Sequence, residues 1–336
     1  MTTVRYALIR TIQVRNTNVP GTLGALATAI GDSGANIGNI QTVHISQNHV
    51  LRDIDVQVND DAHLSRVLVA VAAVPGVEVV ESRDEVLGMH LGGKIETISR
   101  FPVENLATLR KVYTPGVAEV SRVIAQFPDR VHTYTGISNT VAIITDGTAV
   151  LGLGNVGLAA AMPVMEGKSA LLHQFAGVSG VPILVNAESV DKFVDTVARI
   201  APTFGGIHLE DIGSPECFEI VRQLRSRLDK PVMQDDQDGT AAVVLGAVMA
   251  ACKAAGKKLE SLRIGQIGLG AAGLAIGKLL MEATQNPVTG ADIDKDSLAR
   301  MGELGGQVAS MEEVIRRSDI LIATTGVPSL IPPDLI

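Results

Sequence analysis

The stretch from residue 208 to 240 constrains the fold more than any other, because it places a strand, a helix and a second strand in a fixed order. Apolar residues at 207–209 and 231–233 predict two strands, and the periodic segment 216–228 predicts a helix between them. Ser214 is expected to cap this helix, since its hydroxyl can accept a bond from a free amide. Such a βαβ unit has parallel strands, which end at the same edge of a sheet.

Each of these strands is followed by two adjacent carboxylates, Glu210 and Asp211 after the first and Asp235 and Asp236 after the second. We therefore expect four acids at one edge of the sheet. Like charges raise each other's pKa unless a cation neutralises them, and oxygen ligands suit Mg²⁺ or Mn²⁺. The alternative is that these are solvated loop acids, as most Asp and Glu are.

A second strong pattern is the glycine motif GLGAAG at 268–273. A predicted strand at 262–267 precedes it, a helix follows, and a further strand at 287–291 ends in Asp292, about 20 residues after the last glycine. The glycines allow a tight turn and a close approach of backbone amides to a pyrophosphate, and the acid can bind ribose hydroxyls. The pattern predicts a Rossmann-type NAD site formed by Gly268, Gly270, Ala271, Ala272, Gly273 and Asp292. Asp292 would repel a 2′-phosphate, which favours NAD over NADP.

An earlier glycine motif, Gly152, Gly154 and Gly157, follows strands predicted at 141–145 and 149–153. No acid follows at the expected distance, so we do not expect it to bind a dinucleotide. The chain continues into an apolar helix that carries Lys168. This lysine either extends to solvent or is buried near a metal, which would lower its pKa until it could accept a proton.

Tyr113 precedes a proline–glycine turn in the segment LRKVYTPGVAEV. It is either an ordinary core or surface residue, or a general acid tuned by a nearby cation. Farther along the chain, the nearly all-apolar segment after Thr240 is expected to be a helix buried between layers or domains.

Residues 1–82 have a pattern of their own. Strands predicted at 6–14, 38–46, 51–58 and 76–82 and helices at 22–33 and 62–73 give the ferredoxin-like order βαββαβ. The phrase NVPGTLGALATAIGDSGANIGNI resembles the ACT regulatory module. This resemblance implies pairing of modules through their sheets and an amino-acid effector near residues 18–21, although the module could serve only to dimerise the chain.

Composition narrows the class of protein. The net charge of −8 argues against a nucleic-acid surface, and no apolar run is long enough to span a bilayer or form a signal peptide. Two cysteines cannot form a disulfide framework, which fits a cytoplasmic protein. Aromatic residues make up 3% of the chain, so its cores must be aliphatic, and the high hydropathy suggests a buried oligomer interface.

From about residue 88 onward the chain resembles the malic enzyme family, through VYTPGVAEV, ITDGTAVLGLGNVG, PVMEGKSALL, GGIHLEDIGSPECF, QDDQDGTAAVV and the motif at 268–273. The resemblance implies oxidation of L-malate with NAD and Mg²⁺ or Mn²⁺, followed by decarboxylation to pyruvate. We also expect a homodimer or higher homo-oligomer. The resemblance further implies that Glu210, Asp211 and Asp236 are the metal ligands. Lys168 would be the general base, Tyr113 the general acid, and Asp235 the residue that orients Lys168.

We therefore expect an α/β multidomain protein with an ACT-like domain (1–82), a substrate- and metal-binding domain (83–240) and an NAD-binding Rossmann domain (241–336) that is incomplete at its C-terminus. One departure from the family pattern is Asp238, where many bacterial relatives carry histidine. Two alternatives remain open: a malolactic-type or other metal-dependent 2-hydroxyacid enzyme, and a truncated sensor that binds a metabolite without turnover.

Overall fold

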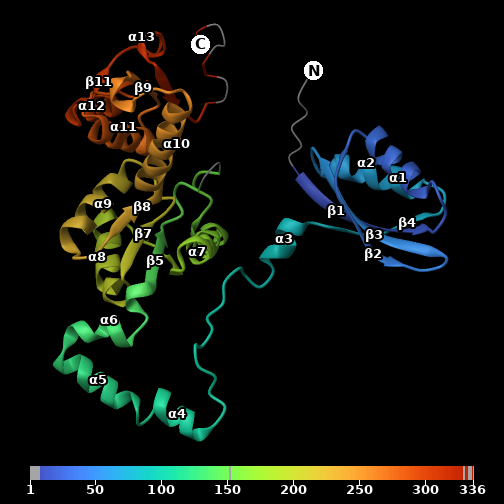
Figure 1. Ribbon diagram of the computed structural model, residues 1–336, viewed down its shortest axis with the longest axis horizontal. Helices are drawn as coiled ribbons and strands as arrows, with labels where there is room; N and C mark the ends of the chain where they lie inside the picture. Colours follow the sequence, from blue (N-terminus) through green and yellow to red (C-terminus); the bar gives the residue numbers. More distant parts are fainter. Residues whose placement is uncertain (1–7, 151–152, 328–329, 332–334, 336) are drawn as a thin grey trace. The chain divides into compact units, whose positions relative to one another are not determined.

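The computed structural model describes residues 8–150, 153–327, 330–331 and 335. The chain divides into two compact units, residues 1–94 and 95–336 (Figure 1).

The first unit is a four-stranded antiparallel sheet with two helices on one face. Its elements are β1 (Leu8–Thr17), α1 (Thr22–Asp32), β2 (Asn36–Ile45), β3 (His49–Val58), α2 (Asp61–Ala72) and β4 (Val77–Arg83), followed by α3 (Glu85–His90). The sheet order β2-β3-β1-β4 and the element order confirm the ferredoxin-like prediction. Leu26 and Ile30 of α1 pack against Ile12 and Val14 of β1 in an aliphatic core, while several apolar side chains on the uncovered face of the sheet are exposed.

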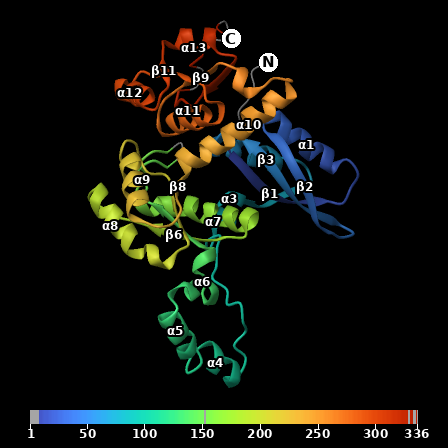
Figure 2. The same ribbon diagram turned by 60° about the vertical axis from the view of Figure 1, so that its left-hand side comes forward.

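The second unit begins with short helices that precede its first sheet. They are α4 (Leu106–Val112), α5 (Val117–Gln126), η1 (Pro128–Arg130), α6 (Val131–Tyr134) and η2 (Ile137–Asn139). No residue from 95 to 139 is buried in the chain. We call this segment the arm. Figures 1 and 2 both show α4 and α5 apart from the sheet that follows.

A parallel sheet of order β6-β5-β7-β8 follows the arm. Its elements are β5 (Thr140–Thr145), η3 (Leu158–Ala161), α7 (Met162–Ala176), β6 (Ser179–Leu184), α8 (Val190–Ile200), η4 (Ala201–Thr203), β7 (Gly206–Leu209), α9 (Glu216–Arg227) and β8 (Val232–Gln234). Alternate residues of β5 and β7 face opposite sides: Ala142 and Ile144 join the core under α8 and α9, which also holds Ile207 and Leu209. Helix α7 covers the other face (Figure 2).

The last sheet, of order β11-β10-β9-β12, is also parallel. Its elements are β9 (Ile264–Ile267), α11 (Ala271–Thr284), β10 (Thr289–Ala291), α12 (Lys295–Glu303), β11 (Gln307–Val308), α13 (Met311–Arg317) and β12 (Ile320–Ala323). This is the strand order of the first half of a Rossmann sheet plus its crossover strand, as predicted. The π-helical turn η5 (Asp235–Gly239), α10 (Thr240–Ala254) and η6 (Leu259–Ser261) join the two sheets.

Three local predictions were wrong. Described residues at 149–153 form a bend and one bridge, Val150 to Gly154, in place of a strand, because two positive-φ glycines follow closely. Residues 151 and 152, and hence Gly152, lie outside the described part. Pro215 occupies the N-cap position of α9 in place of Ser214, with no side-chain cap.

Helix α10 also differs from expectation. Only Ala241, Val248 and Cys252 are buried in this chain, whereas Val243 is 73% exposed. A single stripe of the helix packs against α11 and the core of the last sheet, so its apolar composition exceeds what one packed face requires. No helix in the described part is both long and apolar enough to cross a bilayer.

Candidate active site

Four carboxylates and one lysine meet at the carboxyl ends of β7 and β8. We call Lys168, Glu210, Asp211, Asp235 and Asp236 the acid cluster. Because β7 and β8 are parallel neighbours, with Leu209 beside Gln234, the residues after them emerge at the same edge. Glu210 and Asp211 are buried, and Asp236 is partly buried in the turn η5.

Lys168 lies on α7 and points to the same edge of the sheet. Its Nζ donates to Asp235 Oδ2 at 2.8 Å and lies 3.4 Å from Glu210 Oε1. Burial alone would lower the pKa of Lys168, but the hydrogen bond to Asp235 and the charges of both carboxylates raise it above its usual value. The expected lowering depended on a nearby metal and stays a prediction, whereas the contacts with Asp235 and Glu210 raise the pKa of Lys168.

Asp236 shows the electrostatic cost of the cluster. Its pKa is raised, first by burial and then by the charges of Glu210 and Asp235, while a hydrogen bond from the side-chain Nε2 of Gln234 opposes the rise. A partly buried carboxylate surrounded by carboxylates is stabilised by a cation. The oxygen-only donor set of Glu210, Asp211 and Asp236 therefore fits a hard divalent ion such as Mg²⁺ or Mn²⁺.

Asp211 has an unusual backbone for a residue other than glycine, with φ at +53°. Aspartate tolerates this left-handed region better than most residues do. The carbonyl oxygen of Asp211 accepts a bond from the Ala149 amide at 3.0 Å, which ties the turn to the loop after β5.

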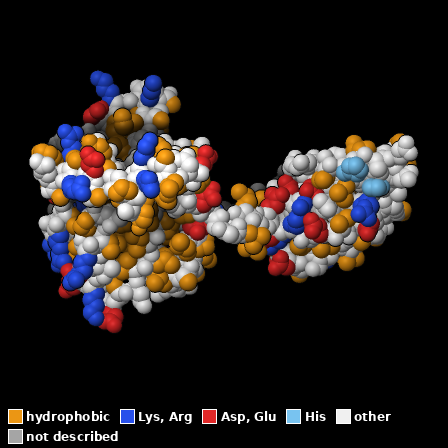
Figure 3. All heavy atoms as spheres, turned by 90° about the horizontal axis from the view of Figure 1, so that it is seen from below, with side chains coloured by type: hydrophobic (Ala, Val, Ile, Leu, Met, Phe, Trp, Pro, Cys, Tyr) orange, Lys and Arg blue, Asp and Glu red, His pale blue; other side chains and the backbone are white. Residues whose placement is uncertain are grey.

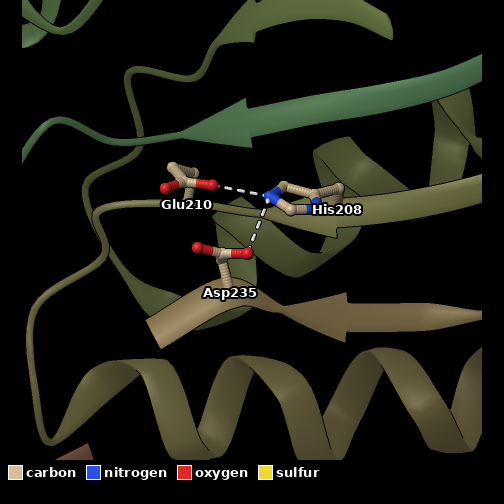
Figure 4. A group of neighbouring side chains, drawn as sticks. All are labelled: His208, Glu210 and Asp235. Atoms are coloured by element: carbon tan, nitrogen blue, oxygen red, sulfur yellow. Dashed lines mark hydrogen bonds and ion pairs between the residues drawn. The ribbon is translucent and has the colours of Figure 1, made fainter. Parts of the chain in front are cut away.

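His208 is a member of the site that the sequence reasoning missed (Figure 4). Its Nε2 lies 2.6 Å from Glu210 Oε2 and 4.0 Å from Asp235 Oδ1, and its side chain is buried. The ligand atoms of His208, Glu210 and Asp235 all lie within 4.8 Å of one another, so this group could also hold a metal. The available signal was the two-residue spacing on one strand, which puts His208 and Glu210 on the same face.

Asp238 contacts Arg225 and the backbone of Gln234, whereas its neighbours Asp235 and Asp236 belong to the acid cluster. Its Oδ2 accepts hydrogen bonds from the Arg225 guanidinium at 2.7 Å and from the backbone amide of Gln234 at 2.9 Å. Arg225 also donates to the carbonyl oxygen of Val232 at 3.1 Å. Asp238 therefore links the turn η5 to α9 and helps to fix the turn that carries Asp235 and Asp236.

Tyr113 is not brought to the acid cluster within the chain. It is the C-cap residue of α4, in the arm, and is 66% exposed. Among the described residues, its side chain makes no hydrogen bond to Lys168 or to any of the four acids.

The glycine loop after β9 is shaped by close backbone contacts. A Cβ on Gly273 would lie 1.9 Å from the Gly268 carbonyl oxygen, and one on Gly268 would lie 2.4 Å from the Thr324 carbonyl oxygen. A Cβ on Gly270 would meet nothing within 4 Å, so this position opens to the space in front of α11. Ala271 and Ala272 begin α11, whose free amides face this space.

Asp292 lies at the carboxyl end of β10, beside that loop. Its Oδ2 accepts a bond from the Leu269 amide at 2.5 Å, and its Oδ1 accepts one from the Asp294 amide at 2.9 Å. The carboxylate is thus fixed next to the turn where a dinucleotide's ribose would lie.

Comparison with known proteins places the chain in a family. Residues 8–81 match the ACT domain, and residues 92–225 match the malic enzyme N-terminal domain. NAD-dependent malic enzyme 1 of Bacillus subtilis is 50% identical over 331 residues, which are 98% of this chain and 75% of that protein. The chain belongs to the malic enzyme family.

Other malic enzymes agree in sequence and in structure. The NAD-dependent malic enzyme of Geobacillus stearothermophilus is 45% identical over 80% of this chain and 56% of its own length. The crystal structure of an NAD-dependent malic enzyme from Thermotoga maritima superposes with a TM-score of 0.69 at 35% identity, covering 75% of this chain and 71% of that one. The malic enzyme from Pyrococcus horikoshii gives 0.67 at 40% identity, over 72% and 62%.

Proposed function

We propose that this protein is an NAD-dependent malic enzyme that oxidises and decarboxylates L-malate to pyruvate with a divalent metal. The observation that carries the proposal is the acid cluster itself, in which a lysine on α7 meets four carboxylates at one sheet edge, in a chain that also has a Rossmann glycine loop. Its relatives named as NAD-dependent malic enzymes support the substrate and the cofactor.

In this proposal Glu210, Asp211 and Asp236 hold the metal. A divalent ion there would supply Lewis acidity to the hydroxyl oxygen of malate and would favour the neutral form of Lys168 by its positive charge. Glu210, Asp211 and Asp236 fit a divalent metal ion because they offer carboxylate oxygens at a place where uncompensated negative charge is costly.

Lys168 has the role of general base toward the C2 hydroxyl. Asp235 accepts a hydrogen bond from its Nζ at 2.8 Å and fixes the direction in which the amine points. Loss of the hydroxyl proton makes departure of hydride to the nicotinamide easier, and Tyr113 is the proposed acid that protonates the enolate carbon after CO₂ leaves.

The glycine loop and Asp292 form the proposed NAD site. Gly270 leaves room for the pyrophosphate, and the amides at the start of α11 face it. Asp292 offers a fixed carboxylate to the ribose hydroxyls, which disfavours a 2′-phosphate.

We also propose that the ACT unit regulates the enzyme by binding a small effector, such as an amino acid, and that the protein is a homo-oligomer. The match of residues 8–81 to the ACT domain supports regulation. The exposed apolar side chains on the open face of its sheet support pairing between copies.

The test measures NADH release from L-malate with Mn²⁺ and identifies the product. We expect pyruvate, loss of rate with a chelator, and loss of rate in Lys168→Ala with the circular dichroism spectrum unchanged. Release of NADH that is insensitive to the chelator would contradict the metal assignment. Because one relative is named a bifunctional malic/malolactic enzyme, lactate is measured in the same samples; lactate without net NADH would establish the malolactic reaction instead.

A further inference from the structure

Gln266 is a polar side chain buried on a strand of the last sheet. Charged side chains are spread over the face of the molecule that Figure 3 shows, where water solvates them. Gln266, in contrast, is 0% exposed on β9, which has a neighbouring strand on each side. Its Oε1 is buried and has no hydrogen-bond partner among the described residues. An unpaired buried acceptor costs stability, and an apolar side chain of similar size would avoid that cost. Stability alone therefore does not account for glutamine at this position.

The side-chain amide of Gln266 donates to the start of the glycine loop. Its Nε2 lies 3.0 Å from the carbonyl oxygen of Gly268 and 2.9 Å from Oγ1 of Thr324, which follows the neighbouring strand β12. The Thr324 hydroxyl donates to the same Gly268 oxygen at 3.2 Å. Two side chains from adjacent strands thus hold this carbonyl group in one direction. We call Gln266 and Thr324 the carbonyl clamp.

Gly268 needs contacts of this kind because its own backbone is permissive. Its φ is +86°, a conformation that glycine adopts without steric cost and also leaves easily, since it has no Cβ. Groups outside residue 268 must therefore fix the direction of its carbonyl. The clamp supplies two hydrogen bonds, and the first turn of α11 packs against the same oxygen, at the place where a Cβ on Gly273 would lie 1.9 Å away.

The peptide group between Gly268 and Leu269 carries this constraint to Asp292. A trans peptide group is planar, with its C=O and N–H on opposite sides, so the direction of one fixes the direction of the other. The Leu269 amide donates to Asp292 Oδ2 at 2.5 Å, while the Gly268 oxygen accepts from the clamp. Rotation of this peptide group would break both sets of contacts and would turn the Gly268 oxygen toward the carboxylate, which would repel it.

We infer that Gln266 is a positioning residue for the dinucleotide, which acts through the Gly268–Leu269 peptide group to hold Asp292 in place for the ribose hydroxyls. The inference rests on the proposed NAD site. A fixed carboxylate accepts hydrogen bonds from the 2′-hydroxyl of NAD and repels the 2′-phosphate of NADP. The carbonyl clamp therefore contributes to the choice between the two coenzymes, although Gln266 is buried beneath the loop.

Gln266→Met tests the inference, because methionine fills a similar volume without a hydrogen-bond donor. Titrations of NADH and NADPH, followed by coenzyme fluorescence, need no turnover. We expect the Kd for NADH to rise about tenfold, as loss of one hydrogen bond to a ligand does, and the Kd for NADPH to change less than about threefold. Denaturant melts should show no loss of stability, since the unpaired Oε1 leaves the core.

Two results of these titrations would overturn the inference. Unchanged NADH binding in Gln266→Met would show that the loop keeps its shape without the clamp. Lower stability together with an equal weakening of NADH and NADPH binding would assign Gln266 to the fold alone.

Thr324 tests the clamp from the neighbouring strand, and it decides the matter if Gln266→Met does not fold. Thr324→Val keeps the shape of the side chain and removes the hydroxyl, whereas Thr324→Ser keeps the hydroxyl. We expect Thr324→Val to weaken NADH binding about fivefold and Thr324→Ser to bind as the wild type does. Equal NADH binding by the two variants would contradict a role for the hydroxyl and overturn the clamp.

A double-mutant cycle with Asp292→Ser tests the path through the peptide group. If Gln266 acts through Asp292, Gln266→Met has no further effect on NADH binding once Asp292 is replaced, whereas additive losses would overturn the inference. A wild-type chain that binds no NADH would overturn the proposed NAD site and this inference with it. If the wild type binds NADH but does not oxidise malate, the proposed reaction fails, and the titrations still decide the role of Gln266.

Discussion

The two sites of this chain lie at equivalent places, the carboxyl ends of neighbouring parallel strands, but they are built in opposite ways. The site after β7 and β8 consists of charged side chains: Lys168 Nζ lies 2.8 Å from Asp235 Oδ2 and 3.4 Å from Glu210 Oε1. The site after β9 is formed by backbone that packs so closely at Gly268 and Gly273 that neither position has room for a Cβ. The first is therefore sensitive to charge and the second to volume, and substitutions that separate these properties should affect only one site.

The largest expected effect comes from removing one charge without changing size. Asp236→Asn should lower the rate of malate oxidation by about 1,000-fold and weaken Mn²⁺ binding, because a proposed ligand is lost. Folding should remain intact, since a carboxylate with a raised pKa is replaced by a neutral group. Steady-state kinetics and titration of Mn²⁺ by electron paramagnetic resonance check this. Asp229→Asn, at an exposed position outside the cluster, is the matched control, and an equal loss there would contradict the assignment.

A methyl group should damage the glycine loop. Gly273→Ala should lower the free energy of unfolding by about 3 kcal/mol, because its Cβ would overlap the Gly268 oxygen. Gly270→Ala is the control for volume alone: its Cβ meets no protein atom, so stability should be unchanged while NAD binding weakens. Denaturant melts and NAD titrations measure the two effects. Equal stabilities of the two variants would contradict the division of roles.

His208 tests whether the charged site depends on a buried neighbour. His208→Ala removes the hydrogen bond to Glu210 and should weaken Mn²⁺ binding by about tenfold, as loss of a residue that orients a ligand does. His208→Gln retains a donor and should recover part of the affinity. Tighter Mn²⁺ binding in His208→Ala would show that the histidine competes with the metal for Glu210.

The smallest effect concerns a surface pair in the last sheet. Arg263 donates to both oxygens of Asp319, and these bonds hold the pKa of Asp319 at about 2, below its usual value. A lowered folded pKa stabilises the protein above the ordinary pKa of aspartate, and this contribution is lost as pH falls toward 2. Arg263→Gln should therefore raise slightly the pH at which acid unfolding begins, measured by circular dichroism, and leave stability at pH 2 unchanged. Because both groups are accessible, an effect as large as that of Gly273→Ala would contradict this account.

The sequence predicted most of the architecture because alternating patterns and glycine turns are local signals. The order of the elements in both units and the convergence of the acids after β7 and β8 followed from such patterns. The exposure of α10 could not be predicted, since apolar composition does not say how many faces have a partner.

The rise in the pKa of Lys168 could not be predicted either, because it depends on distances to Asp235 and Glu210 that only the fold sets. The contact of His208 with Glu210 could not be predicted, because every strand has residues two apart on one face and the spacing does not show which of them meet.

The left-handed backbone at Asp211 bears on how such a site can decay over evolutionary time. Glycine and asparagine also accept this conformation, and each is a single nucleotide change from aspartate, but neither keeps the negative charge. Glutamate keeps the charge and fits the turn poorly. Drift at this position therefore tends to preserve the fold while removing the charge, so a descendant with Asn or Gly at 211 would lose one carboxylate of the acid cluster long before its architecture changed.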